Sequence, residues 1–140
     1  MPSWSIGFPE KERLHVCLSS ELFSNRGYEW LSAKVRINVG GFVGDVSMTL
    51  LFGELMRFKE QLETLFRTLR GKAELKTLEG QLHIVVEVDK LGHVTAKGEL
   101  CDGAGIGNVL RFEIRFDQTL LWHTISELGE ALLEISEKKV

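Results

Sequence analysis

The stretch WLSAKVRINVGGFVGDVSMTLLFGELMRFKEQLETLFRTL, residues 30–69, predicts two strands followed directly by a helix. Apolar and polar residues alternate on both sides of Gly40-Gly41, which indicates two strands joined by a turn, each with one buried face. The apolar spacing then becomes helical, and Gly71 is expected to end the helix as a glycine cap. The residues expected to point inward are Leu31, Ala33, Val35, Ile37 and Val39 in the first strand, Phe42, Val46, Met48, Leu50 and Phe52 in the second, and Leu55, Phe58, Leu62, Leu65, Phe66 and Leu69 in the helix.

The same order of elements returns near the end of the chain. Residues 94–100 and 110–116 alternate on either side of a glycine-rich loop, and a second helix follows, with Asp117 or Thr119 expected to cap its first turn. This hairpin-plus-helix pseudo-repeat has two explanations: an internal duplication, or the general similarity of any two strand–strand–helix segments. The apolar stripe expected on the second helix consists of Leu121, Ile125, Leu128, Leu132 and Ile135.

The remaining segments add short strands. Residues 1–12 are interpreted as an entry arm or an edge strand, because apolar residues alternate there until Pro9. Further strands are expected within residues 13–18, 72–78 and 82–88. Since the loops between consecutive strands are short, we expect these strands to be antiparallel neighbours.

The predicted fold class is α+β: one twisted antiparallel sheet of about seven strands with two helices packed on one face. The 140 residues suit a single domain, residues 1–140, with an adequate core. The other face of the sheet is expected to be open to water or to a partner. The residues expected to meet in one core are Phe58, Leu62, Phe66, Phe112, Ile114, Leu121, Ile125 and Leu128.

Composition and charge narrow the class of protein. A net charge of −3 gives no basic field for nucleic acid, and no apolar run approaches the roughly 20 residues of a membrane span. The N-terminus lacks the basic and apolar regions of a signal peptide. Cys17 and Cys101 fall at outward strand positions, and a domain of this size needs no disulfide. We therefore expect two free thiols and a cytoplasmic protein without a nucleic-acid or membrane partner.

No motif predicts catalysis, a metal or a cofactor. The glycine-rich loop, residues 102–108, precedes a strand, whereas a phosphate-binding loop precedes a helix, so we expect a wide hairpin loop. Hydrolase motifs are absent. Glu87, Glu99 and Glu113 lie among basic residues of the strands, which is typical of exposed cross-strand ion pairs. Four histidines stand without metal-ligand spacing and are expected at the surface: His15, His83, His93 and His123.

An acidic stripe is the candidate partner-binding site. It consists of Glu127, Glu130, Glu134 and Glu137 on the solvent side of the second helix, with no basic residue before Lys138. Four like charges at this spacing do not stabilise a helix. The stripe is therefore either an ordinary solvated face or a surface for a basic partner, for which charge would speed encounter and select against wrong partners.

Several short segments occur in a characteristic order over roughly residues 28–135. They are Trp30-Leu31-Ser32, Gly41-Phe42, Gly71-Lys72-Ala73-Glu74-Leu75, Glu79-Gly80, Val88-Asp89-Lys90-Leu91-Gly92, Ala104-Gly105-Ile106-Gly107, Leu110-Arg111-Phe112 and Asp117-Gln118-Thr119-Leu120. This ordered set resembles the WapI family of bacterial immunity proteins. The resemblance implies a non-enzymatic protein, without a cofactor, that protects a bacterium by binding a cognate polymorphic toxin domain in the cytosol.

Two other functions remain open from the residues. A small ligand would fit a pocket between helices and sheet if small inward residues such as Gly44, Ala96 and Gly98 left space there. An exposed edge strand or sheet face would instead suit a homo-oligomer. The immunity function is compatible with a monomer or a weak homodimer.

Overall fold

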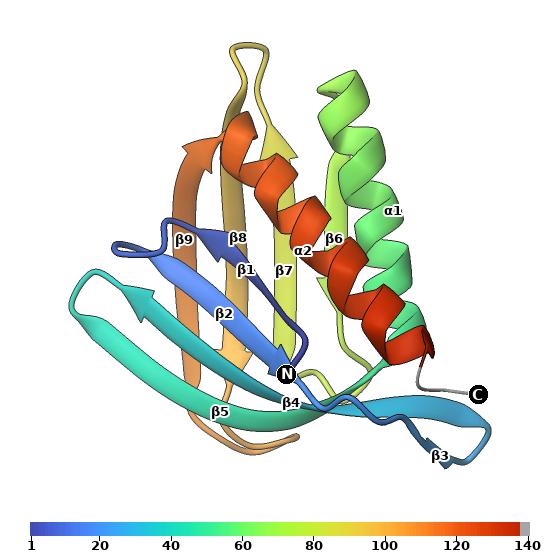
Figure 1. Ribbon diagram of the computed structural model, residues 1–140. Helices are drawn as coiled ribbons and strands as arrows, with labels where there is room; N and C mark the ends of the chain where they lie inside the picture. The colour runs from blue at the N-terminus through green and yellow to red at the C-terminus, as the bar shows by residue number, and fades with distance from the viewer. Residues whose placement is uncertain (138–140) are drawn as a thin grey trace.

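A computed structural model describes residues 1–137 of the chain. Eleven elements follow one another, with each helix placed directly after a hairpin (Figure 1). The elements are β1 (Ser3–Gly7), β2 (Arg13–Leu18), β3 (Phe23–Asn25), β4 (Tyr28–Val39), β5 (Phe42–Leu51), α1 (Phe52–Thr68), β6 (Lys72–Lys76), β7 (Leu82–Val88), β8 (His93–Cys101), β9 (Val109–Asp117) and α2 (Gln118–Glu137).

The strands form two antiparallel sheets. In sheet A the order is β1-β2-β4-β3, and β5 pairs with the other side of β4; in sheet B the order is β6-β7-β8-β9. The α+β class and the antiparallel pairing are confirmed, but the prediction of one sheet of about seven strands is wrong. Alternation fixes which side chains point inward, yet it does not fix which strands are neighbours. Here α1 separates β5 from β6, so the sheet does not continue from one hairpin to the next.

The strands of sheet A run across those of sheet B, and the two helices lie side by side along one flank of the molecule (Figure 1). Helix α1 packs against β6 and α2, and α2 packs against α1 and β1. The apolar faces of both sheets and both helices therefore enclose one core. No helix within residues 1–137 is both long enough and apolar enough to cross a membrane.

In both hairpin-plus-helix units a carboxylate accepts backbone hydrogen bonds where the strand becomes the helix, but from a different position. Glu54 reaches back to the N-cap, where its Oε1 accepts a hydrogen bond from the Leu51 amide at 2.8 Å. Asp117 caps α2 as expected, because its Oδ1 accepts from the amides of Thr119 and Leu120. Two expectations fail at α1. Phe52 begins this helix instead of ending the strand, and Leu69 takes the C-cap position in the left-handed conformation, with φ 53°. Gly71, which also has a positive φ, 87°, lies two residues beyond the cap.

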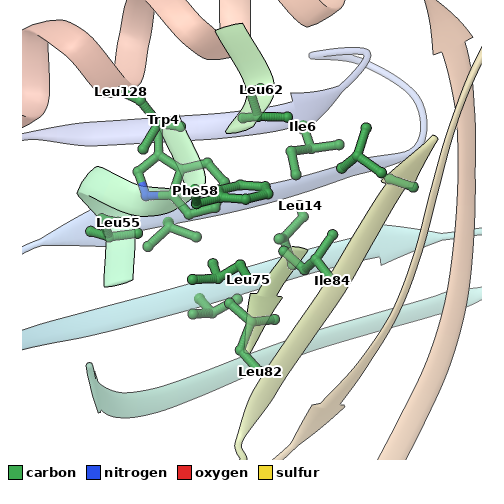
Figure 2. Packing of buried hydrophobic residues seen from close by; sticks show 14 of the residues in the cluster. Trp4, Ile6, Leu14, Leu55, Phe58, Leu62, Leu75, Leu82, Ile84 and Leu128 are labelled. Carbon is green, nitrogen blue, oxygen red and sulfur yellow. The ribbon is translucent and has the colours of Figure 1, made fainter. Parts of the chain in front are cut away.

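The predicted core is present with one exception. Figure 2 shows Trp4 of β1 beside Phe58 of α1, with ring centroids 5.9 Å apart. Phe66 is only partly buried, because its ring packs against the half-exposed Trp122 at the surface of the helix pair. The other seven predicted core residues are buried: Phe58, Leu62, Phe112, Ile114, Leu121, Ile125 and Leu128.

Two further residues that were expected to point inward, Phe42 and Gly98, have different surroundings. Phe42 is 65% exposed, because it lies at the tip of the β4–β5 hairpin beyond the part of β5 that the core covers. Gly98 faces the core, but the Phe112 ring fills the space beside it, and an added Cβ would lie 2.6 Å from Phe112 Cζ. The small inward residue Gly98 therefore serves close packing and leaves no room there for a ligand.

Candidate partner-binding surface

The acidic stripe borders a shallow groove between α2 and the first residues of the chain. Glu130, Glu134 and Glu137 are exposed along one side of α2, and residues 1–3 form the opposite wall. Two apolar side chains also line the groove and are exposed, Met1 at 83% and Leu133 at 61%. No lysine, arginine or histidine side chain of residues 1–137 lines it. We call this surface, with Glu130, Glu134, Glu137, Met1 and Leu133, the acidic groove.

Glu127 belongs to the same stripe but has a structural role. Its Oε1 accepts a hydrogen bond from the Ser5 hydroxyl at 2.9 Å and another from the Ser5 amide at 3.2 Å. One turn earlier, the Thr124 hydroxyl donates to the Ser5 carbonyl at 2.6 Å. Both backbone groups of Ser5 are thus satisfied by α2 on the edge of β1 that faces away from β2. We call these three contacts the edge latch. They hold the Glu127 carboxylate against β1, so Glu127 is not part of a freely solvated helix face.

The surroundings of the edge latch are polar and partly buried. His15 pairs with Ser5 across β1 and β2, and Arg13 Nη2 lies 3.0 Å from His15 Nδ1. Burial, followed by the nearby Arg13 charge, lowers the pKa of His15, and Glu127 acts in the opposite direction. The lowered pKa favours the neutral form of the His15 imidazole beside the Arg13 guanidinium.

The other sequence candidates lie apart from this surface. The loop at residues 102–108 is a hairpin loop as predicted, closed by Asp102, which accepts from the backbone amide and side-chain amide of Asn108. These bonds lower the pKa of Asp102. The expected cross-strand pairs on sheet B are confirmed: Lys72–Glu87, Lys97–Glu113 and Arg111–Glu99.

The histidines and cysteines do not form a cluster. His83 contacts Glu74 at 2.6 Å and His93 contacts Asp89 at 3.0 Å, both as isolated surface pairs, while His123 is exposed on α2. Cys17 in sheet A and Cys101 in sheet B are half-buried free thiols, as expected. Within residues 1–137, no three histidine, cysteine, aspartate or glutamate side chains gather as metal ligands do.

Sequence reasoning missed a second surface feature, the β3–β4 hairpin. Arg26 and Gly27 form its turn, and β3 pairs with the start of β4. Phe23 and Tyr28 of this hairpin are exposed, and Trp30 is partly buried. A three-residue strand is too short to show alternation, so only the turn residues and the aromatic side chains on either side of them signalled it.

Comparison with a protein-family model shows to which family the chain belongs. The model of the immunity protein WapI-like family matches residues 5–135. The chain belongs to the WapI-like immunity protein family. This confirms the resemblance stated from the ordered sequence segments. The match includes residues 5–7 of β1 and all but the last two residues of α2, and therefore Ser5, Thr124 and Glu127 of the edge latch.

Solved structures resemble this WapI-like chain in fold. One is the plant transcriptional regulator PBF-2, with a TM-score of 0.57 and 11% identity, covering 97% of this chain and 82% of that one. Another is MRP1/MRP2 of Trypanosoma bruciei, with a TM-score of 0.48 and 14% identity, covering 94% of this chain and 83% of that one. A search of curated protein sequences finds no match. At this level of identity, the first likeness establishes a shared fold.

The edge latch predicts a difference in stability between neighbouring glutamates of the WapI-like chain. Glu127→Ala leaves the buried amide and hydroxyl of Ser5 without an acceptor, so it should lower the free energy of unfolding by about 1–3 kcal/mol. Glu127→Gln keeps an oxygen at that position and should cost less. Urea unfolding measures both, with the exposed Glu130→Ala as the matched control. Equal stability of the Glu127→Ala and Glu130→Ala variants would show that the latch contributes nothing.

Proposed function

We propose that this chain is a cytoplasmic immunity protein that neutralises a cognate bacterial toxin domain by binding it, without catalysis and without a cofactor. Membership of the WapI-like immunity family carries this proposal. The structure adds a surface suited to such binding. The acidic groove combines three exposed carboxylates with two exposed apolar side chains, a mixture that fits a basic, partly apolar protein surface.

The acidic groove is the part of the candidate stripe that is available to a partner. Glu130, Glu134 and Glu137 have no role in the edge latch, so their charges are free to attract a basic partner. Glu127 is held by Ser5, and we assign it to positioning α2 beside the groove. The proposed contact residues are therefore Glu130, Glu134 and Glu137, with Met1 and Leu133 as the apolar contacts.

Co-expression tests the function and the surface together. The wild-type chain should restore growth to cells that express the toxin domain encoded beside its gene. The Glu130→Lys, Glu134→Lys, Glu137→Lys variant should fold normally, because exposed charges add little to stability. It should associate with the toxin domain at least about tenfold more slowly at low salt, since electrostatic steering is lost. Stopped-flow binding and growth rescue are the two measurements.

A second triple charge-reversal variant distinguishes an effect of the acidic groove from an effect of the net charge. Glu10, Glu60 and Glu87 are exposed and lie outside the groove, and Glu87 loses only a 3.6 Å surface contact with Lys72. Their reversal to lysine changes the net charge by the same amount and should leave association much closer to wild type. Failure of the wild-type chain to protect cells would refute the function. Equal effects of the two triple variants would refute the groove as the contact surface.

A further inference from the structure

The β3–β4 hairpin presents three aromatic side chains on one face. In the strand register Phe23 is opposite Trp30 and Asn25 is opposite Tyr28, and side chains of paired residues lie on the same side of a sheet. Phe23, Tyr28 and Trp30 therefore share a face. Tyr28 is 49% exposed and Phe23 is 43% exposed, and all three residues of β3 are exposed. Figure 1 shows the hairpin projecting from the body of the molecule.

The hairpin is held in one conformation although it projects. Arg26 and Gly27 both have positive φ, 54° and 80°, as the tight two-residue turn of a twisted hairpin requires. The Trp30 indole N–H donates to the Asn25 carbonyl at 3.2 Å, and the Tyr28 and Trp30 rings meet edge to face, with centroids 6.3 Å apart. Exposed aromatic side chains that are already ordered lose little entropy on binding, which is the property of binding hot spots.

The hairpin adjoins the acidic groove through Met1. Met1 lines the acidic groove and also a second groove that contains Ser19 and Ser32 at the base of the hairpin. The Ser32 amide donates to the Ser19 hydroxyl, which ties the base of the hairpin to the end of β2. Lys34 is the basic side chain of residues 1–137 in the second groove, and it lies four residues from Trp30, further into sheet A. Met1 thus links the carboxylates of the acidic groove to the serines at the base of the hairpin, and Trp30 lies two residues before Ser32 on the same face of β4.

We propose that the β3–β4 hairpin is a docking arm whose aromatic face holds an arginine-bearing segment of the partner protein beside the acidic groove. Naming that partner as the toxin domain rests on the proposed function. Aromatic faces attract guanidinium groups through their quadrupole, and the neighbouring carboxylates attract the same charge. Single-stranded nucleic acid also stacks on aromatic side chains, but its phosphates would be repelled by the three glutamates.

A binding experiment with a synthetic probe tests this chemistry without the toxin. The probe is a short fluorescein-labelled peptide of alternating arginine and glycine, titrated with the full chain and followed by fluorescence anisotropy. The Phe23→Ser, Tyr28→Ser variant should bind it at least about fivefold more weakly, because the cation–π contacts are removed. A lysine–glycine peptide should bind more weakly than the arginine one to the wild type, since an ammonium group does not stack on a ring as a guanidinium does.

Two other hairpins supply the matched control. Phe42 and Leu91 are 65% and 82% exposed at the tips of the β4–β5 and β7–β8 hairpins, so Phe42→Ser, Leu91→Ser removes similar apolar surface elsewhere. This control should bind the arginine peptide like wild type. Circular dichroism checks folding, and Tyr28→Ser alone replaces the double variant if the latter is unfolded.

Three results would overturn the docking arm: no binding of the arginine peptide to wild type, equal binding by the hairpin variant and wild type, or tighter binding of an oligothymidine than of the peptide. These results are separate from the co-expression test. A chain that binds the peptide through the hairpin but gives no protection refutes the proposed function alone. A chain that protects cells equally well with and without Phe23 and Tyr28, and whose peptide binding is unaffected by their loss, refutes the docking arm alone.

Discussion

Truncating Leu62 to alanine should lower the free energy of unfolding by about 2–5 kcal/mol, because it removes a fully buried side chain and leaves a cavity. Leu62 lies on the inward face of α1 within the cluster that Figure 2 shows, together with Trp4 and Ile6 of β1 and Leu128 of α2. These residues belong to three elements that are distant in sequence, so the cavity cannot close by a local shift of one of them.

Denaturant unfolding of Leu62→Ala and Met56→Ala measures this effect. Met56 lies on the same helix but is 44% exposed, so its truncation should cost less than about 1 kcal/mol. The comparison keeps helix propensity nearly constant, since both variants introduce alanine into α1. Wild-type stability of Leu62→Ala would mean that the inward face of α1 has been misplaced.

Substituting Gly98 with alanine should cost about 3 kcal/mol or more, at or beyond the upper end of ordinary overpacking. A Cβ at this position would lie 2.4 Å from the His83 carbonyl oxygen and 2.6 Å from Phe112 Cζ. The first neighbour is backbone, so a rotamer change cannot relieve the contact, and β7 and β8 must move apart. A thermal or urea unfolding curve measures the loss.

The control for this substitution is Gly53→Ala near the start of α1. A Cβ there would meet no neighbouring atom within 4 Å. Alanine also has a higher helix propensity than glycine, so the free energy of unfolding should stay the same or rise by up to about 1 kcal/mol. If Gly98→Ala were as stable as Gly53→Ala, the close approach between β7 and β8 would not exist in solution.

The local elements were predictable from the sequence because they depend on neighbouring residues. Alternation at Trp4 and Ile6 indicated the first strand, and the spacing of Leu121, Ile125 and Leu128 indicated the buried face of α2; all five side chains are buried. The division into two sheets was not predictable. Strand parity is a local property, whereas the pairing of strands depends on contacts between distant segments.

At the candidate site, too, sequence patterns predicted local positions but not contacts between distant residues. Spacing placed four glutamates along α2, and three of them are exposed there. The role of Glu127 depends on Ser5, which is 122 residues away. The spacing of residues along a helix does not show which distant segment packs against it. The aromatic hairpin escaped prediction for a different reason: β3 has only three residues, all of them exposed, so it leaves no periodic signal.

The edge latch also bears on the order in which the protein is made. During synthesis β1 emerges before α2, so the outer backbone groups of Ser5 find their partners, Thr124 and Glu127, only when α2 has left the ribosome. Until then the nascent chain carries an open strand edge, which is prone to pair with other chains. A fragment truncated before residue 124 would lack both partners of Ser5, so this edge of β1 would stay open and favour aggregation.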